Sequence, residues 1–185
     1  MQEGGPPYLL LDACCLLNLC ATQRITEILQ SLPRRFEMAE NVMAEVNYVR
    51  RGGEGEDADE LDPIELQPLV DIELLDLLHL QGSNEERSFV NFSADLGDGE
   101  AMTLAIALHR NRAVATDDRK AARIAHEHAI PVISTLEIIR QWSEDVALST
   151  AALRQILINL HERGRYLPAR SHPLHPWWER NIANT

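Results

Sequence analysis

The sequence predicts an α/β protein of three layers, in which helices cover both faces of a mostly parallel central sheet. Short apolar runs at 8–11, 113–116 and 132–133 have the length and composition of buried strands. Segments with helical periodicity alternate with these runs from Tyr8 to Trp142. Alternation of strand and helix is typical of a parallel α/β sheet with helices on its faces.

The first third of the chain is predicted to begin with a central strand at 8–11 that ends in Asp12. An apolar helix follows from residue 13 to 19. Thr22 is expected to cap a second helix, which stops at Pro33. A short strand at 34–38 and a helix at 39–50 complete this third.

The middle of the chain is predicted to hold a mobile loop, two helices and an edge strand. Residues 51–62 are rich in Gly and acids and lack periodicity, as surface loops do. Residues 63–80 are expected to form a short helix and then the edge strand. Gly82, Ser83 and Asn84 open a helix that runs through Leu96.

The segment 96–123 is predicted to contain a helix, a strand and the start of another helix. The first helix has an apolar stripe, with Asp98 as its cap and Glu100 in its first turn. The strand at 113–116 ends in two acids, of which Asp117 is expected to cap the next helix. A minimal strand at 132–133 and a helix at 135–142 follow.

The C-terminal part is predicted to be an extension, with a first domain at 1–145 and the extension at 146–185. An amphipathic helix ends at Gly164, and the tail after it is rich in Pro and carries two adjacent tryptophans. This extension can pack on the domain or bind a partner. His172 and His175 lack acidic or Cys companions, so we expect them to be turn residues.

Composition limits the classes of function. The chain has 185 residues, of which 45% are hydrophobic, and its formal net charge is −12. This acidity argues against a general nucleic-acid coat, because phosphate binding relies on Lys and Arg. No apolar run approaches the roughly 20 residues of a membrane span, and the start lacks the basic segment of a secretory signal, so a cytoplasmic protein without membrane contact is expected. The cysteines are expected to be reduced and to carry no chemistry: Cys14, Cys15 and Cys20.

Carboxylates from four separate elements are candidates for one site: Asp12, Glu45, Glu100, and Asp117 or Asp118. Three lie near element ends that an α/β sheet gathers at one edge. Taken singly, each acid could be a helix cap or could extend into water. Two carboxylates about 4 Å apart repel by about 4 kcal/mol at an effective dielectric near 20, so a gathered set needs protons or a cation. Oxygen ligands favour Mg²⁺ or Mn²⁺ over zinc.

Four segments occur in the order in which they occur in PIN-domain ribonucleases, and the chain resembles that family over about 8–142. The segments are YLLLDACCLLNL, VMAEV, GDGEAMTLAIAL and ATDDRKAAR. The resemblance implies one or two Mg²⁺ or Mn²⁺ ions held by Asp12, Glu45, Glu100 and Asp118, with Asp98 and Asp117 as alternates. Thr116 sets the register onto Asp118, and Asn18 matches a polar position of the relatives. Cys14 stands where the family usually has Ser or Thr.

The resemblance implies a metal-dependent endoribonuclease, similar to the toxin half of bacterial toxin–antitoxin pairs. RNA would be bound through Arg119, Lys120 and Arg123, and the protein partners would be an antitoxin or a second copy of the chain. Two other functions stay open: a PIN-like interaction module that uses the C-terminal helix and tail, and a metal-dependent phosphatase or DNA nuclease.

Overall fold

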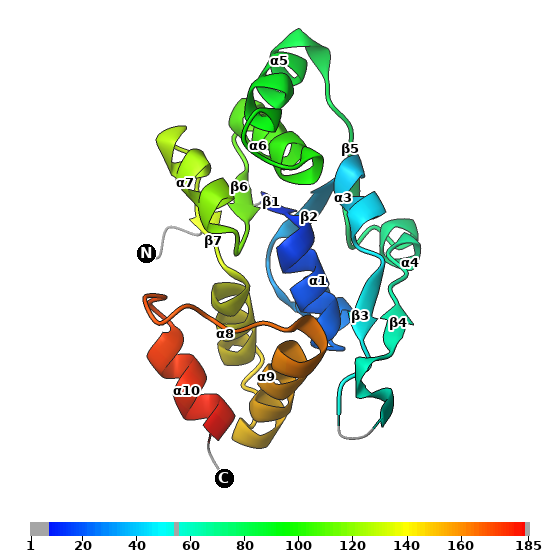
Figure 1. The fold of residues 1–185 in the computed structure, drawn as a ribbon, viewed down its shortest axis with the longest axis vertical. Coiled ribbons are helices and arrows are strands. Elements are labelled where there is room, and N and C mark those ends of the chain that lie inside the picture. The colour runs from blue at the N-terminus through cyan, green and yellow to red at the C-terminus, as the bar shows by residue number, and fades with distance from the viewer. Residues whose placement is uncertain (1–7, 54–55, 184–185) are drawn as a thin grey trace.

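Five parallel strands form the central sheet of the computed structural model, which describes residues 8–53 and 56–183 (Figure 1). The strand order is β5-β2-β1-β6-β7, and each neighbouring pair is parallel. The predicted α/β fold with a parallel sheet is therefore confirmed. The strands are β1 (Tyr8–Leu11), β2 (Arg35–Ala39), β5 (Asp76–Leu78), β6 (Ala113–Ala115) and β7 (Val132–Ile133).

The order of the strands places a topological switch point between β1 and β6. From β1 the chain proceeds outward through β2 to β5, whereas β6 returns to the other side of β1 and leads to β7. Ligands of open α/β sheets bind outside the carboxyl ends of the strands at such a point. The residues that directly follow β1 and β6 therefore occupy the position where a site is expected.

Helices cover both faces of this sheet. Figure 1 shows α5, α6 and α7 on one side and α1, α8 and α9 on the other. Because β1 lies between two layers of helices, Leu9, Leu10 and Leu11 are fully buried. The helices of these layers are α1 (Ala13–Ala21), α2 (Ile25–Ser31), α5 (Gly82–Ser93), α6 (Asp98–Arg110), α7 (Arg119–Glu127), α8 (Thr135–Asp145) and α9 (Thr150–Gly164).

The helix predicted at 39–50 is wrong beyond Glu45. Helix α3 (Glu40–Glu45) ends there, since Val46 has left the helical region with φ −91° and ψ 83°. Strand β3 (Tyr48–Arg50) then pairs antiparallel with β4 (Leu61–Pro63). Val46 and Val49 are both buried, a pattern that a helix or a turn followed by a strand satisfies equally well.

The mobile loop predicted at 51–62 is also wrong for most of that segment. It contains a short 3-10 helix, η1 (Glu56–Asp59), and strand β4. Arginines of β3 and the residue after it pair with acids of the segment: Arg50 with Asp59, and Arg51 with Glu60 and Asp62. The acidic residues whose abundance predicted a solvated loop form these ion pairs. Residues 54–55 lie outside the described part.

Two smaller boundary predictions are corrected. Thr22 does not cap α2 but ends α1, where its hydroxyl donates to the Leu19 carbonyl at 2.5 Å and accepts from the Arg24 amide at 3.1 Å. Helix α5 ends at Ser93 rather than Leu96. The predicted edge strand is β5, and the short helix before it is α4 (Gln67–Asp71).

The C-terminal extension is helical and packs on the same core. Helix α9 ends at Gly164 as predicted, and α10 (His175–Ala183) follows the Pro-rich segment. Trp178 is 3% exposed and meets Tyr166 edge to face, with ring centroids 5.7 Å apart. Among the described residues, no helix has the length and apolar composition needed to cross a membrane. The N-terminal expectation concerns residues 1–7, which lie outside the described part.

Candidate active site

The acidic site begins where β1 and β6 end side by side. Leu11 is paired with Ala115, and the Asp12 amide donates to the Ala115 carbonyl at 3.0 Å. Asp12 and Thr116 therefore occupy neighbouring positions at the carboxyl edge of the sheet. The Thr116 hydroxyl donates to Asp12 Oδ2 at 2.9 Å and joins the two strand ends.

Asp12 is only 2% exposed, and three hydrogen-bond donors hold its carboxylate. It caps α1 by accepting a hydrogen bond from the Ala13 amide at 2.7 Å. The Cys14 thiol donates to Oδ2 at 3.2 Å, alongside Thr116. Cys14, for which the sequence predicted no chemistry, thus provides the hydrogen bond that a Ser or Thr would provide at this position.

Asp118 and Thr116 are linked on the β6 side. Asp118 Oδ1 caps α7 by accepting from the amides of Lys120 and Ala121 at 2.7 and 2.8 Å. The Asp118 amide donates to the Thr116 hydroxyl at 3.1 Å. The cap fixes one carboxylate oxygen and leaves Oδ2 without a hydrogen-bond partner in the described part of the chain.

Glu45 and Glu100 approach from the helices that border this edge. Glu45, the last residue of α3, accepts from the Gly99 amide at 3.0 Å. A Cβ atom at Gly99 would lie 2.5 Å from Glu45 Oε1, so only glycine permits this contact without a shift. Glu100 folds back on the start of α6 and accepts from the Gly97 amide at 3.2 Å. In each glutamate the second oxygen has no hydrogen-bond partner among the described residues.

Neighbouring carboxylates add to the raised pKa of three members of the set, Asp12, Glu45 and Glu100. Burial is the main cause of the raised pKa of Asp12, and the charge of Asp118 adds to it. Burial likewise raises the pKa of Glu45, to which Asp12 and Asp98 contribute. Burial, with the charges of Asp12, Asp118 and Glu45, raises the pKa of Glu100. The structure thus brings together the four acids that the sequence singled out.

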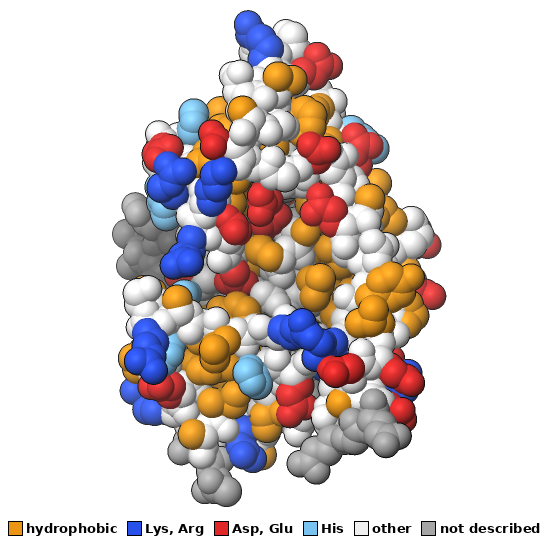
Figure 2. All heavy atoms as spheres, viewed as in Figure 1, with side chains coloured by type: hydrophobic (Ala, Val, Ile, Leu, Met, Phe, Trp, Pro, Cys, Tyr) orange, Lys and Arg blue, Asp and Glu red, His pale blue; other side chains and the backbone are white. Residues whose placement is uncertain are grey.

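These four acids have no Lys or Arg ion-pair partner within the described residues. Figure 2 shows acidic side chains gathered in the middle of one face, with Lys and Arg side chains to one side of them. The free carboxylate oxygens and the shared negative charge fit a hard divalent cation, which takes oxygen ligands. We name these residues the acid cluster: Asp12, Glu45, Glu100 and Asp118.

Asp117 has a different role from the predicted helix cap, which Asp118 provides. Its carboxylate turns away from the acid cluster and accepts from the Asn18 amide group at 2.9 Å. It also accepts from the Thr135 amide at 3.1 Å and the Thr135 hydroxyl at 2.5 Å. Asn18 therefore anchors Asp117 and ties β6 to α1. The sequence gives no signal for this role of Thr135, because a Thr at the start of a helix is common.

Asp98 was predicted to cap α6, but Gly97 is the residue at that position and Asp98 lies in the first turn. Asp98 is near enough to Glu45 to raise the pKa of that carboxylate. Among the described residues, Cys14, Cys15 and Asp117 also place one ligand atom each within 4.8 Å of one another. Burial raises the pKa of the Cys15 thiol well above its usual range, which keeps it protonated and makes it a poor metal ligand.

The three basic residues predicted to bind RNA differ in what holds them. Lys120 pairs with Asp95 at 3.3 Å, and Arg123 pairs with Glu127 at 2.6 Å. Arg119 has no ion-pair or hydrogen-bond partner in the described part of the chain. It follows Asp118 directly, so it is the cation of the three most available to a phosphate beside the acid cluster.

Comparison with protein families agrees with the fold. A family model described as a PIN domain matches residues 8–172, which extends the 8–142 resemblance through α9 and into the segment that follows it. A comparison with curated proteins gave no match. The family match covers well over half of the chain, and the chain therefore belongs to the PIN-domain family.

Proposed function

We propose that this protein is a metal-dependent endoribonuclease that hydrolyses phosphodiester bonds of RNA. One observation carries the proposal: the four carboxylates of the acid cluster lie together at the switch point of the sheet and have no Lys or Arg ion-pair partner among the described residues. PIN domains are generally nucleases, which agrees with this arrangement. The toxin half of a toxin–antitoxin pair in the cytoplasm is the biological setting we propose.

Asp12, Glu45, Glu100 and Asp118 would hold one or two Mg²⁺ or Mn²⁺ ions. Such an ion supplies an activated water and offsets negative charge at a phosphodiester. The protein fixes the ligands: Thr116 and Cys14 hold Asp12, and Gly99 holds Glu45. Asp98 stays the alternate ligand on the Glu45 side, and Asp117 becomes a less suitable alternate because its oxygens already accept four hydrogen bonds.

RNA would reach the acid cluster along the start of α7. Arg119 would contact a phosphate directly, whereas Lys120 and Arg123 would first have to leave Asp95 and Glu127. The net charge of −12 makes the binding local rather than general, because a polyanion is repelled by most of the surface. We therefore expect the affinity for RNA to fall only modestly with added salt, because the salt dependence scales with the number of phosphate contacts and that number is small here.

The test is cleavage of a panel of single-stranded and structured RNAs with Mn²⁺, compared between the wild type and Asp12→Asn. Asn fills the same volume but removes one ligand charge, so we expect cleavage to fall by about 1,000-fold or more while circular dichroism is unchanged. Asp145→Asn is the matched control, since Asp145 is exposed at the end of α8. Wild-type activity in Asp12→Asn would remove the acid cluster from the mechanism.

Substrate controls separate the other functions. Cleavage of DNA but not RNA would indicate a DNA nuclease, and release of phosphate from monoesters would indicate a phosphatase. Metal binding without hydrolysis of any of these substrates would favour the interaction module. Size-exclusion chromatography with light scattering would show whether a second copy of the chain is a partner.

A further inference from the structure

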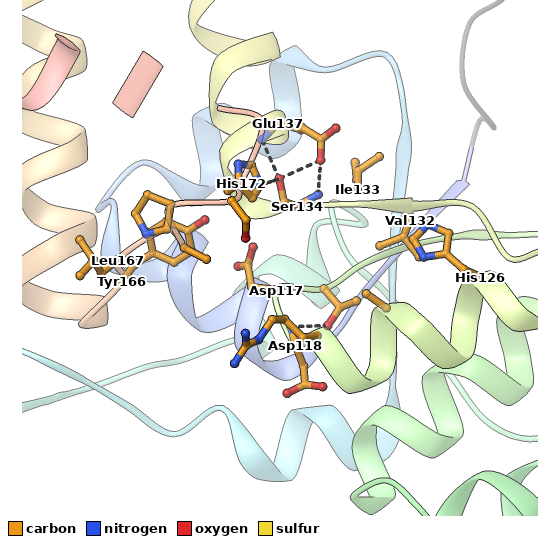
Figure 3. Close-up of a pocket in the computed structure, with 16 residues that line it drawn as sticks. Asp117, Asp118, His126, Val132, Ile133, Ser134, Glu137, Tyr166, Leu167 and His172 are labelled. Carbon is orange, nitrogen blue, oxygen red and sulfur yellow. Dashed lines mark hydrogen bonds between the residues drawn. The ribbon is translucent and has the colours of Figure 1, made fainter. Parts of the chain in front are cut away.

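A cavity of about 570 Å³ lies beside the acid cluster and shares Asp118 with it (Figure 3). Ligand pockets of proteins have volumes of about 300–1,000 Å³, so this one can hold a group the size of a nucleoside. Its walls come from the start of α7, from β7 with the start of α8, and from the segment 166–172 that follows α9. The proposed function makes no use of this cavity.

The segment that closes the cavity is fixed to α8 through His172. His172 Nδ1 accepts from the Leu174 amide at 3.0 Å, so the ring proton is on Nε2, which lies 3.0 Å from Ser134 Oγ. Ser134 Oγ in turn donates to Glu137 at 2.8 Å (Figure 3). A protonated Nε2 cannot accept a proton from Ser134, so the group does not form an activated nucleophile. It holds a wall in place instead.

The walls combine flat rings, apolar groups and one available cation. Tyr166 is positioned by its contact with Trp178, and His172 by Ser134. Leu167 is 68% exposed at the cavity although it is apolar. Arg119 also lines the cavity and has no partner in the described part of the chain. Bases of single-stranded RNA bind by packing on aromatic and apolar side chains, while cations bind the backbone.

We infer that this cavity holds one nucleoside of the RNA strand, next to the phosphate that lies at the acid cluster. The inference rests on the proposed function, because the acid cluster defines where the neighbouring phosphate lies. Asp118 belongs to both the acid cluster and the cavity, so the two sites are contiguous. Arg119, one residue further along, contacts the phosphate between them. The cavity is therefore the part of the protein that selects which position of the strand is cut.

The first experiment fills the cavity without touching the acid cluster. Ala122 lines it from α7, and Ala122→Phe places a ring in the space proposed for the base. Ala151→Phe, at an exposed position of α9, is the matched control. We expect the KM for a single-stranded RNA to rise about tenfold in Ala122→Phe and kcat to stay within about twofold, because the loss is of one stacked base. Ala169→Phe fills the cavity from the opposite wall if Ala122→Phe fails to fold.

The second experiment keeps this inference separate from the proposed function. The full chain in EDTA is titrated with the four ribonucleoside 5′-monophosphates and followed by NMR. We expect wild type and Ala151→Phe to bind at least one of them and the cavity-filling variants to bind it about tenfold more weakly. Such binding without any RNA cleavage would overturn the proposed function and leave the cavity assignment in place. Cleavage with an unchanged KM in the variants, or nucleotide binding that neither variant weakens, would overturn the cavity assignment.

Discussion

Carboxylates that lie partly or fully within the fold occur with and without a cationic partner in this protein. On the β2 and α5 side, Glu37 is paired with Arg112 at 3.0 Å and Glu85 with Arg110 at 2.8 Å. Across the sheet, at the carboxyl ends of β1 and β6, the acid cluster has no Lys or Arg partner among the described residues. The same type of side chain is thus neutralised by the chain itself in one place and left with its charge in the other.

The difference shows in which neighbouring groups oppose, and which add to, the effect of burial on each pKa. Hydrogen bonds from Arg110 lower the pKa of Glu85, and Arg112 opposes the rise that burial causes at Glu37. Burial raises the pKa of Asp12, Glu45 and Glu100, and neighbouring carboxylates raise it further. An acid without a counter-cation costs stability, so its retention points to a ligand from outside the chain.

Removing a structural cation should give the largest loss of stability. Arg110→Met leaves Glu85 with a side chain only 6% exposed and no cation, so we expect a loss of about 3 kcal/mol in the free energy of unfolding. Arg123→Met breaks an exposed pair with Glu127 and should cost less than about 1 kcal/mol. Urea denaturation of both variants measures the difference. Equal losses would mean that Glu85 is as well solvated as Glu127.

Binding of a divalent cation at the acid cluster should raise the free energy of unfolding by an amount similar to the loss expected for Arg110→Met. A ligand that binds only the folded state stabilises it by about 2.7 kcal/mol at a concentration 100 times its Kd. We expect Mn²⁺ to raise the Tm of the wild type and to raise that of Asp12→Asn much less. A thermal shift in Asp12→Asn equal to that of the wild type would locate the Mn²⁺ outside the acid cluster.

Glu85 and the acid cluster should respond to pH with opposite sign. The pKa of Glu85 is lowered, so its contribution to stability is present above the unfolded value of about 4.3 and is lost as the pH falls through the folded value. The pKa values of Asp12, Glu45 and Glu100 are raised, so the metal-free protein should lose stability as the pH rises through them. In EDTA, the free energy of unfolding of Asp12→Asn should increase relative to that of the wild type as the pH is raised from 4 to 8. A constant difference would contradict the raised pKa of Asp12.

Much of the fold was predictable because β1, β6 and their helices have strong local patterns. The run of leucines before Asp12 has no plausible place except the middle of a sheet, and β1 is buried there. The β3–β4 hairpin was not predictable, because Val46 and Val49 fit a helical face and only long-range pairing decides between the two. Propensity is overruled in such segments by tertiary contacts.

The acid cluster was predictable as a set of residues but not in its supports. Acids at strand ends can be identified from the sequence, whereas a hydrogen bond depends on where side chains meet. Thr116 donates to Asp12 and Thr135 donates to Asp117 through contacts between residues 104 and 18 positions apart, which only the folded chain brings together. The roles of Asp117 and Asp118 at the α7 cap were exchanged for the same reason, since both follow β6 and either could reach the amides.

Because Asp118, and not Asp117, caps α7, replacing each of these two residues by Asn should have a different effect. Asp118→Asn keeps the α7 cap, because Asn caps a helix almost as well as Asp, and should cost only a few tenths of a kcal/mol. Asp117→Asn would turn an amide group toward the donors of Asn18 and Thr135, so we expect a loss of about 1–3 kcal/mol. Cleavage and Mn²⁺ affinity should fall in Asp118→Asn and persist in folded Asp117→Asn. The reverse result would make Asp117 the ligand.

The smallest effect on stability, with a clear effect on activity, is expected at Gly99. Ala at this position places a Cβ 2.5 Å from Glu45 Oε1, and the flexible carboxylate can move away at little cost in stability. Ala is also better than Gly inside a helix by up to about 1 kcal/mol, so the free energy of unfolding should stay the same or rise. Glu45 would nevertheless lose the amide that positions it, and losing such a support typically costs about 10- to 100-fold in metal affinity or activity.

Gly97→Ala is the matched control for Gly99→Ala, since a Cβ there lies 3.8 Å from its nearest neighbour, Glu100 Oε2. We expect Gly97→Ala to cleave RNA within about twofold of the wild type, because the contact it introduces is ordinary van der Waals distance. Single-turnover cleavage and Mn²⁺ titration of both variants, with urea denaturation alongside, separate positioning from folding. If Gly99→Ala were as active as Gly97→Ala, the contact of Glu45 with the Gly99 amide would have no part in the reaction, and the acid cluster would act through its other three members.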